Sequence, residues 1–410
     1  MAHIDRLDPV VRMIMVQQDH ACSWADTFAA MPESGSPVRV LVVGQTPPPF
    51  GGQAVMIAKL LEGNYEKVRL YHVRMAFSPE MDSVGRFELR KLWVLLVTIF
   101  RIIAARIRWR PEVLYYPPSG PNIVPVLRDI VLLNSVRWMF RHTVFHFHAG
   151  GLSTFQERLP GILRPFYRSA YRNASLAIRT SILAPADGLA LGAKAEAVVA
   201  NGIEDRAGGV IERVKRSNQP LNILFTALLI PSKGVDVLLD SFAYLVKDGL
   251  DVRLLLMGRW GDPSYERHCL AKMDHLEITD RVEVLGVRTG EDKHSDFLRS
   301  DIFCFPTHFE SESFPVVLME AAQYGLPVVA TNWRGLPVMV QEGVTGYLVP
   351  IKDPVAVAAR LAELVRDDVK RLRMGAASRA QFEQAFTLER FQRNMEHALV
   401  QAVEPTRSPQ

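Results

Sequence analysis

The feature that most constrains the fold is an alternation of short apolar runs with longer helical segments, which begins again near residue 205. The first run, Val38–Gly44 (VRVLVVG), is followed by the loop PPPFGGQ and by AVMIAKLLEG, a helix-like segment that Gly63 closes. A run that is apolar throughout is typical of a parallel strand buried on both faces. Strand, glycine loop and helix together indicate the opening unit of a doubly wound sheet.

Similar strand-like runs recur along both halves of the chain. The first half contains EVLYYP, TVFHFHAGG, LAIRTS and AVVANGIED, and the second contains LNILFTALLIPSKG, VRLLLMG, RVEVLGV, SDIFCFPT and PVVATN. Strands that alternate with helices predict parallel α/β sheets. We therefore predict an α/β protein of two Rossmann-like, doubly wound domains that face each other across a cleft, with ligands at the carboxyl ends of the strands.

The chain of 410 residues is too long for one core, and we predict four parts. Residues 1–37 form a variable extension, 38–204 the first domain and 205–385 the second domain. Residues 386–410 are predicted to form a last helix that packs back on the first domain, followed by a tail. Thr387 is a suitable N-cap for that helix.

Composition narrows the classes of partner and compartment. The formal net charge of +4 is too small to indicate nucleic acid, and the three cysteines have no CxxC spacing. A zinc site and a disulfide framework are therefore not expected. The chain also begins without a secretory signal pattern and lacks an apolar run of about 18 residues, so we expect a cytoplasmic protein.

Six separated segments carry a resemblance to a known family. They are PPPFGGQ, FHFHAGG, NGIED, ILFTALLIPSKGVDVLLDSF, ESESFPVVLMEAAQYGLPVVAT and EGVTGYLV. In order and spacing they resemble the retaining, nucleotide-sugar-dependent glycosyltransferases of the GT-B fold, and in detail glycosyltransferase family four. The resemblance extends from about Val38 to Val403. It implies transfer of a sugar from a nucleoside-diphosphate sugar to an acceptor, with no cofactor.

The resemblance implies that two loops bind the donor diphosphate. Gly51 and Gly52 lie between a strand and a helix, where the absence of a Cβ and the helix dipole favour an anion. The plainer alternative is a tight turn. Lys233 in PSKG can supply a positive charge to the diphosphate, although a solvated loop lysine is the commoner case.

One position departs from the family pattern. The family has an arginine five residues before this lysine, whereas this chain has Leu228. We hypothesise that Arg259 or Arg334, each of which follows a strand-like run, supplies the missing charge and contacts the donor. An ordinary surface arginine is the alternative for both.

The Glu-x7-Glu pair, Glu312 and Glu320, surrounds an apolar run. The resemblance implies that Glu320 accepts hydrogen bonds from the donor ribose and that Glu312 lies beside the donor sugar as a catalytic residue. Pro315 suits a first helical turn, which places Glu312 in the preceding loop and Glu320 within the helix. A solvent-facing Glu320 is the alternative, which its apolar neighbours disfavour.

The start of the same helix is expected to contribute to the donor site. The backbone N–H groups of Val316 and Val317 would point at the diphosphate, because a helix N-terminus leaves its first amides unpaired. Phe314 immediately precedes this turn and is included among the expected donor-binding residues.

His148 is the expected catalytic residue of the first domain. The resemblance implies that it contacts the donor sugar or orients the reacting groups. His146 shares its strand face, but His148 lies nearer the carboxyl end of the strand. A strand histidine is more often a satisfied core residue, which is the alternative here.

No segment has the spacing of a metal site; DPS and EDKH do not form a ligand set. We therefore expect metal-independent transfer, in which Lys233, the glycine loop and the helix N-terminus stabilise the departing diphosphate.

The acceptor side is indicated by one basic, amphipathic stretch, residues 86–110. Its centre is rich in Leu, Ile, Val and Trp, and its basic residues are Arg86, Arg90, Lys91, Arg101, Arg106, Arg108 and Arg110, against Glu88 alone. Such a stretch predicts peripheral contact with the cytoplasmic face of an anionic membrane, and hence a lipid-linked or polysaccharide-precursor glycan as acceptor. A domain-packing helix with a basic rim is the alternative.

Two other functions fit the same fold. A GT-B-fold sugar-nucleotide epimerase or a phosphorylase is one. A nucleotide-sugar-binding protein with weak or no turnover is the other, and Leu228 is the feature that favours it.

Overall fold

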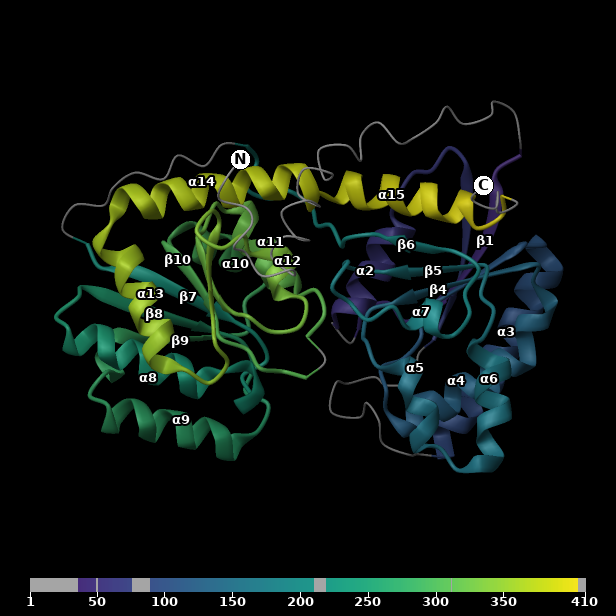
Figure 1. Cartoon of the computed structure of the whole chain (residues 1–410), viewed down its shortest axis with the longest axis horizontal. Coiled ribbons are helices and arrows are strands. Elements are labelled where there is room, and N and C mark those ends of the chain that lie inside the picture. Colours follow the sequence, from purple (N-terminus) through teal and green to yellow (C-terminus); the bar gives the residue numbers. More distant parts are fainter. Residues whose placement is uncertain (1–35, 49–50, 76–88, 210–218, 311, 405–410) are drawn as a thin grey trace, which may run out of the picture. The chain divides into compact units, whose positions relative to one another are not determined.

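The first of two parallel sheets is built from the amino-terminal half of the chain. The computed structural model describes residues 36–48, 51–75, 89–209, 219–310 and 312–404, so the predicted extension lies almost entirely outside the described residues. The sheet has six parallel strands in the order β2-β1-β3-β4-β5-β6 (Figure 1). The strands are β1 (Val38–Gly44), β2 (Val68–Arg74), β3 (Val113–Tyr116), β4 (His142–Phe147), β5 (Leu176–Arg179) and β6 (Glu196–Val198).

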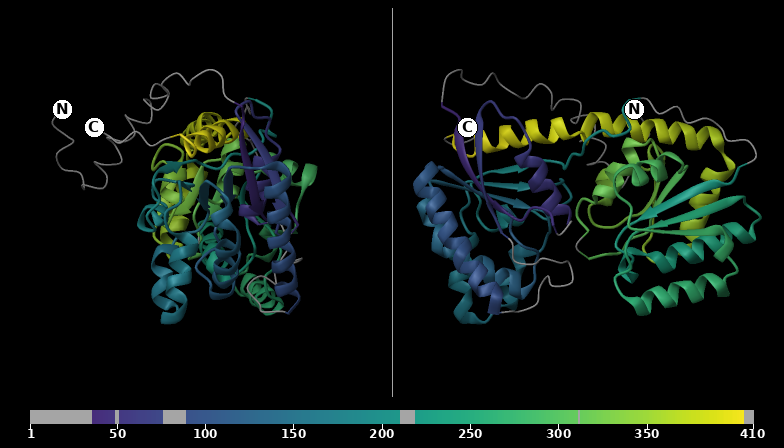
Figure 2. Two further views of the ribbon diagram at one scale, coloured as in Figure 1. Left: turned by 90° about the vertical axis from the view of Figure 1, so that its right-hand side faces the viewer. Right: turned by 180° about the vertical axis from the view of Figure 1, so that it is seen from behind.

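Helices cover both faces of this sheet. They are α2 (Gly52–Leu61), α3 (Leu89–Trp109), α4 (Ile123–Val136), α5 (Leu152–Phe155), α6 (Arg164–Tyr171) and α7 (Asp187–Ala190), with short 3₁₀ turns η3 (Arg137–Met139), η4 (Gln156–Arg158) and η5 (Gly161–Leu163). Successive residues of β1 lie on opposite faces of the sheet and belong to different hydrophobic cores. Leu41 and Val43 pack with α3, α4 and α6, whereas Val40 and Val42 pack with α2. Figure 2 shows α3, α4 and α6 together on one side of the sheet.

The second sheet is built after residue 220. Its six parallel strands have the order β12-β11-β10-β7-β8-β9. They are β7 (Leu221–Thr226), β8 (Val252–Met257), β9 (Val282–Gly286), β10 (Ile302–Phe305), β11 (Val328–Thr331) and β12 (Gly346–Val349). Their flanking helices are η6 (Pro231–Lys233), α8 (Val235–Lys247), α9 (Pro263–His275), η7 (Thr279–Arg281), α10 (Gly290–Leu298), α11 (Val316–Gln323), α12 (Leu336–Met339), α13 (Pro354–Arg366) and α14 (Asp368–Ala385). Two parallel sheets with flanking helices confirm the predicted fold class.

The last helix, α15 (Leu388–Gln401), belongs to the core of the first sheet. Thr387 is its N-cap, as predicted, and its side chain accepts a hydrogen bond from the Arg390 amide at 3.4 Å. Phe391, Met395 and Leu399 are buried in the cluster that contains α2 and strands β1, β3 and β5. The helix therefore covers the face of the first sheet opposite α3, α4 and α6.

Candidate functional site

In the second domain, two of the predicted catalytic residues meet where the strand order reverses. Lys233 ends the turn η6 after β7, and Glu312 lies in the loop after β10, the strand paired with β7. Ligands of open α/β sheets bind at such switch points. The Lys233 Nζ and Glu312 Oε2 atoms are 2.5 Å apart, and the side chains are only 15% and 9% exposed. The structure thus brings two predicted residues, 79 positions apart, into one ion pair.

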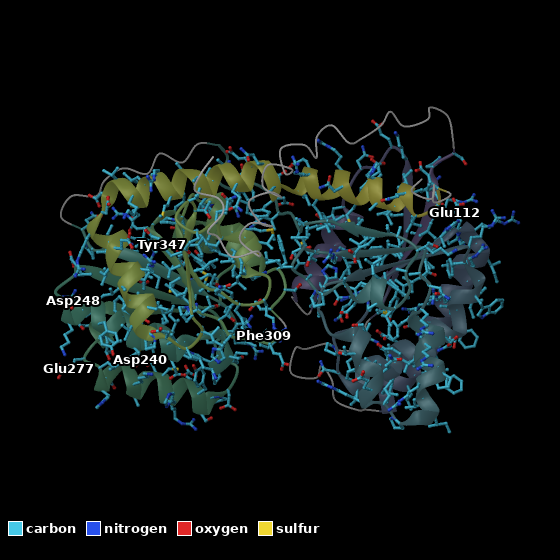
Figure 3. The ribbon with its side chains drawn as sticks, in the orientation of Figure 1. Glu112, Asp240, Asp248, Glu277, Phe309 and Tyr347 are labelled. Carbon is cyan, nitrogen blue, oxygen red and sulfur yellow. The ribbon has the colours of Figure 1, made fainter. Side chains whose placement is uncertain are left out.

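Neighbouring groups fix this ion pair in position. The Thr307 hydroxyl donates a hydrogen bond to Glu312 Oε2 at 3.2 Å, and the Lys233 ammonium lies 4.5 Å from the centre of the Phe309 ring. Phe309 is labelled in Figure 3. Gly234 follows with φ of 83°, and a Cβ there would lie 2.1 Å from the carbonyl oxygen of Pro306. Only glycine therefore permits the close approach of the lysine loop to the end of β10.

Glu320 lies on α11 and has one free carboxylate oxygen. Its Oε1 accepts a hydrogen bond from Lys293 Nζ on α10 at 2.6 Å. Its Oε2 is buried and has no hydrogen-bond partner among the described residues. A buried acceptor without a donor is costly, so this oxygen is suited to a ligand hydroxyl. Lys293 was missed in the sequence because it stands in the polar segment EDKH, where a lysine looks like a solvated residue.

The start of α11 is close to the prediction. The helix begins at Val316 with Pro315 as its N-cap residue, so Glu312 precedes it and Glu320 lies inside it. The amides of Val316 and Val317 belong to the first turn, which leaves them without intrahelical acceptors. Phe314 is buried and its ring meets Phe386 edge to face at 5.8 Å. Any contact of Phe314 with a donor would therefore come from its backbone.

The two arginines proposed to replace the family arginine lie in different surroundings. Both are exposed. Arg259 follows β8 and lines a cavity of about 320 Å³ with Trp260 and Val287. Arg334 stacks on Trp333 at 4.9 Å, and Trp333 donates a hydrogen bond to the Phe309 carbonyl at 2.9 Å. Through Trp333, Arg334 thus lies beside the loop after β10, which also contains Glu312. A role for Arg259 or Arg334 in donor binding stays a prediction.

In the first domain, the predicted glycines lie at the start of α2, just after β1. Gly51 is the N-cap with φ of −109°, a conformation open to any residue, and Gly52 is the first helical residue. A Cβ at either position would meet no heavy atom of the described residues within 4 Å. The backbone and the packing therefore do not require glycine here, which disfavours the tight-turn alternative. Gln53 ties this turn to the loop after β3 through a 3.3 Å hydrogen bond to the Pro117 carbonyl.

His148 follows β4 and its ring lies against that of His146, with the two ring planes inclined by 35°. The two ring centres are 4.1 Å apart, and the Tyr115 hydroxyl is 2.6 Å from His146 Nδ1. Both Nε2 atoms are buried and have no hydrogen-bond partner among the described residues. Burial lowers the pKa of His148 to about 4, and burial together with His148 lowers the pKa of His146 as well. At neutral pH both rings are uncharged, so His148 can offer a neutral imidazole to a ligand.

The lowered pKa of His148 predicts a pH dependence of stability. An unfolded histidine has a pKa near about 6.5, so the unfolded state binds more protons than the native state between that pH and pH 4. Stability from this group is complete above about pH 6.5 and is lost as the pH falls through this window. We expect the midpoint of thermal unfolding to fall less between pH 7.5 and 5 in His148→Asn than in wild type. His275→Asn, at an exposed position, is the control, and equal slopes for wild type and His148→Asn would refute the assignment.

Potential metal ligands are scattered in the described part of the chain. No group of three or more His, Cys, Asp or Glu side chains lies close enough together there to hold a metal ion. Metal independence itself stays a prediction.

Comparison with known proteins gives the family of the second domain. Residues 211–381 match the family described as glycosyl transferases group 1. A relative named as the colanic acid biosynthesis glycosyltransferase WcaL of Salmonella typhimurium is 28% identical over 231 residues, 55% of each chain. WcaL of Escherichia coli is 27% identical over 325 residues, 77% of this chain and 76% of that protein. The chain thus spans about half the length of the Salmonella relative.

The whole fold matches solved structures as well. The structure of HepE from Anabaena, in complex with UDP and glucose, superposes with a TM-score of 0.66 at 18% identity, over 88% of this chain and 99% of that one. At this identity the likeness shows the fold alone. The second domain thus matches the family of group 1 glycosyl transferases, and the chain as a whole has the two-sheet GT-B fold.

Proposed function

We propose that this protein is a retaining glycosyltransferase that moves a sugar from a nucleoside-diphosphate sugar to an acceptor without a metal ion. The observation that carries the proposal is the buried pair of Lys233 and Glu312 at the switch point of the group 1 domain. A lysine and a carboxylate in contact at the ends of adjacent strands supply a cation for a leaving diphosphate and an acidic group beside it. The UDP in the HepE complex supports a nucleoside-diphosphate donor.

Each residue of the candidate site has a separate role in the proposed transfer. Lys233 and the first amides of α11 stabilise negative charge that develops on the departing diphosphate. The free Oε2 of Glu320 accepts a hydrogen bond from a ribose hydroxyl. His148 remains neutral and contacts the donor sugar through its buried Nε2. Retention at the anomeric carbon follows from the resemblance to family four.

A chemical assay tests this proposal directly. UDP-, GDP- and ADP-sugars are supplied with and without a lipid-linked glycan fraction, and release of the free nucleoside diphosphate is measured. Acceptor-dependent release that is unchanged in EDTA, with a product of unchanged anomeric configuration, is expected. An absolute requirement for Mg²⁺ or Mn²⁺ would contradict metal independence. Epimerised donor without release would indicate an epimerase, and tight donor binding without turnover would indicate a binding protein.

The glycines at the start of α2 give a second test of donor binding. Gly52→Ala adds a methyl group in open space at a helical position, so folding stability should be unchanged or slightly higher. Donor affinity should fall, because the methyl group occupies the space expected for the diphosphate. The control is Gly202→Ala, where a Cβ would lie 2.2 Å from the Thr387 carbonyl oxygen, and which should lower stability. A Gly52→Ala protein with normal donor affinity would show that the glycine has no role in binding.

We further propose a lipid-linked or polysaccharide-precursor acceptor, reached at a membrane surface. The name of the WcaL relatives refers to colanic acid biosynthesis, which supports this acceptor class. Helix α3 supports the membrane contact, because it has two apolar faces. Leu95, Ile102 and Ala105 are buried in the core of the domain, whereas Trp93, Leu96, Phe100 and Ile107 are between 50% and 70% exposed. One face of α3 can therefore pack in the core of the domain while the other face contacts a membrane.

The exposed face of α3 has the character of an interfacial helix. The exposed apolar residues recur at intervals of three, four and seven, so they share one side, and exposed Arg101 and Arg108 lie among them. Such a face binds in the plane of an anionic bilayer. Among the helices that the structure describes, none is long and apolar enough to cross a membrane. Residues 86–88 of the predicted stretch lie outside the described residues.

Substitution on this face is expected to weaken membrane binding. Phe100→Glu should lower the affinity for anionic vesicles by about tenfold, because insertion of a phenylalanine side chain is worth about 1.5–3 kcal/mol. Folding stability should be unaffected, since Phe100 is 70% exposed. Cosedimentation is the measurement, and Val369→Glu on α14, at a 78% exposed position, is the control. Equal binding of wild type to neutral and anionic vesicles would contradict the attraction to anionic lipid, and binding to neither would contradict the membrane contact.

A further inference from the structure

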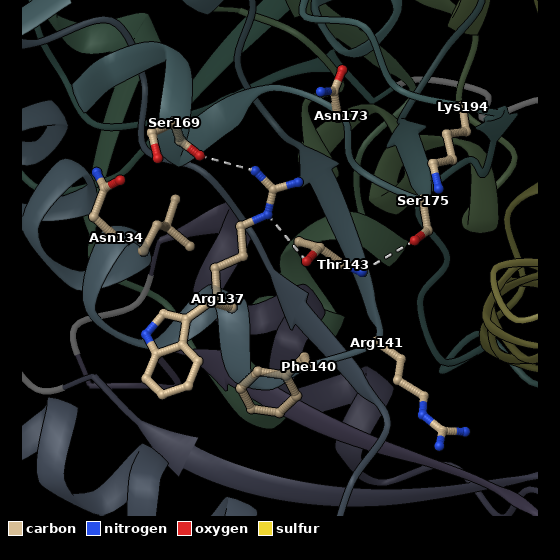
Figure 4. Close-up of a pocket in the computed structure, with 11 residues that line it drawn as sticks. Asn134, Arg137, Phe140, Arg141, Thr143, Ser169, Asn173, Ser175 and Lys194 are labelled. Carbon is tan, nitrogen blue, oxygen red and sulfur yellow. Dashed lines mark hydrogen bonds between the residues drawn. The ribbon is translucent and has the colours of Figure 1, made fainter. Parts of the chain in front are cut away.

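A pocket of the first domain lies at the amino-terminal ends of its strands, the opposite ends from the candidate site. It occupies about 270 Å³ between α4, η3, α6 and the segments that enter β4, β5 and β6 (Figure 4). Gly51 and His148 follow the carboxyl ends of their strands. The pocket residues Arg141, Ser175 and Lys194 instead lie one or two positions before the start of β4, β5 and β6, respectively. The pocket is therefore separate from the residues proposed to bind the donor.

The charge of this pocket is all of one sign. Its lining contains the cationic side chains Arg137, Arg141 and Lys194 and no acidic side chain. In the part of the chain that the structure describes, no carboxylate lies within ion-pair distance of any of the three. Two other arginines of the domain are each paired, Arg128 with Asp129 and Arg179 with Glu196. Uncompensated positive charge thus gathers at this pocket.

Arg137 is the fixed member of the group. Its Nε donates to the Thr143 hydroxyl at 3.2 Å, and its Nη1 donates to the carbonyls of Ala170 and Ser169 at 3.0 and 3.3 Å. Figure 4 shows the guanidinium held between Ser169 and Thr143. The same group lies 5.3 Å from the centre of the Phe145 ring. All these partners are neutral, so they orient the charge without cancelling it.

Burial of Arg137 makes an anion favourable here. Burial lowers the pKa of its guanidinium to about 10, which leaves it protonated at neutral pH. A partly buried cation without a counter-charge is destabilising, and an anion that contacts it recovers electrostatic free energy. No acceptor among the described residues contacts Nη2. One edge of the guanidinium therefore has a donor available for a ligand.

We propose that this pocket binds a phosphate group, carried by a lipid headgroup or free in solution. Arg137 anchors the phosphate through the N–H groups of its Nη2, and Lys194 and Arg141, both exposed, supply further charge at the mouth. Asn134 and Ser169 add neutral polar groups to the lining. Trp138 lines the same pocket and is 77% exposed, which is the position of an aromatic side chain at a lipid headgroup. This site is independent of the proposed transfer reaction.

The test uses the full chain and two phosphate sources. Inorganic phosphate is titrated by calorimetry, and vesicles of phosphatidylcholine with and without phosphatidic acid are tested by cosedimentation. The variant Arg141→Glu/Lys194→Glu changes exposed residues only, so it should fold normally. Its affinity should fall by at least about tenfold, because a hydrogen bond to a charged group is worth about 1.5–3 kcal/mol. Arg158→Glu, an exposed arginine on η4 outside the pocket, is the control.

Each outcome has a defined meaning. If the double variant loses only the binding of inorganic phosphate, the pocket is a site for free phosphate. If it loses only the binding to phosphatidic-acid vesicles, the pocket is a site for a lipid headgroup. Binding through α3 contributes equally to wild type, the double variant and the control, so it cancels in the comparison. The proposal is overturned when the double variant binds both probes as well as Arg158→Glu does, or when wild type binds neither.

Discussion

Replacing Lys233 with alanine is expected to lower kcat by about 10² to 10³-fold, the usual loss when one group that stabilises developing negative charge is removed. Lys233 ends the turn η6 that follows β7, and the family arginine that would share its role is replaced by Leu228. The substitution also leaves Glu312 without its ion-pair partner. Breaking a buried pair costs stability, so thermal unfolding must be measured alongside kinetics.

Three further variants separate charge stabilisation from folding. Lys233→Arg retains the charge and should recover part of the rate. Lys233→Ala/Glu312→Gln removes the unpaired carboxylate and should recover stability without recovering kcat. Lys247→Ala, at the exposed end of α8, should behave as wild type. If Lys233→Ala retained wild-type kcat with saturating donor, charge stabilisation would have to come from another residue, and Arg334 would be the next to test.

Glu320→Gln is expected to raise the donor Kd and KM by about ten- to a hundredfold with a smaller effect on kcat. The reason is the buried Oε2, which has no partner among the described residues and is assigned to a ribose hydroxyl. A hydrogen bond to a charged acceptor contributes about 1.5–3 kcal/mol, and the amide offers a weaker acceptor. Donor binding by calorimetry should accompany the kinetics, because KM equals Kd only when chemistry is slow.

Two controls define this effect. Lys293→Met removes the 2.6 Å ion pair of Glu320 but leaves the carboxylate, so it should weaken donor binding less than Glu320→Gln does. Glu310→Gln changes an exposed carboxylate ten positions earlier and should have no effect. An unchanged donor Kd in Glu320→Gln would remove the ribose assignment and leave Glu320 as a partner of Lys293 only.

Most of the fold could be predicted because most of its strands are buried on both faces. Five strands of each sheet follow apolar runs, and the glycines and helix starts between them mark the boundaries. β2 was missed: its sequence, VRLYHVR, mixes apolar and polar residues, and only Val68 and Val73 in it are buried. It pairs only with β1 at the sheet edge, where a continuous apolar run is not needed. A search for buried parallel strands therefore does not find it.

The residues of the candidate site could be proposed from the sequence, but the contacts between them could not. Lys233 and Glu312 could each be expected near a ligand, yet their ion pair depends on the adjacency of β7 and β10, which only the sheet order supplies. Lys293 depends in the same way on the packing of α10 beside α11. The open space around Gly51 and Gly52 is likewise a property of three dimensions, and no spacing of residues indicates it.

The position of α15 has a consequence for how the protein is made. The helix is the last described element of the chain, yet Phe391, Met395 and Leu399 complete the core of the first sheet. During synthesis, this apolar face of the first sheet is covered only in part, by α2, until residues 388–401 have been translated. A truncated chain that stops before Thr387 would retain all twelve strands and still lack this cover. The amino-terminal half therefore completes its hydrophobic core only after α15 has been translated.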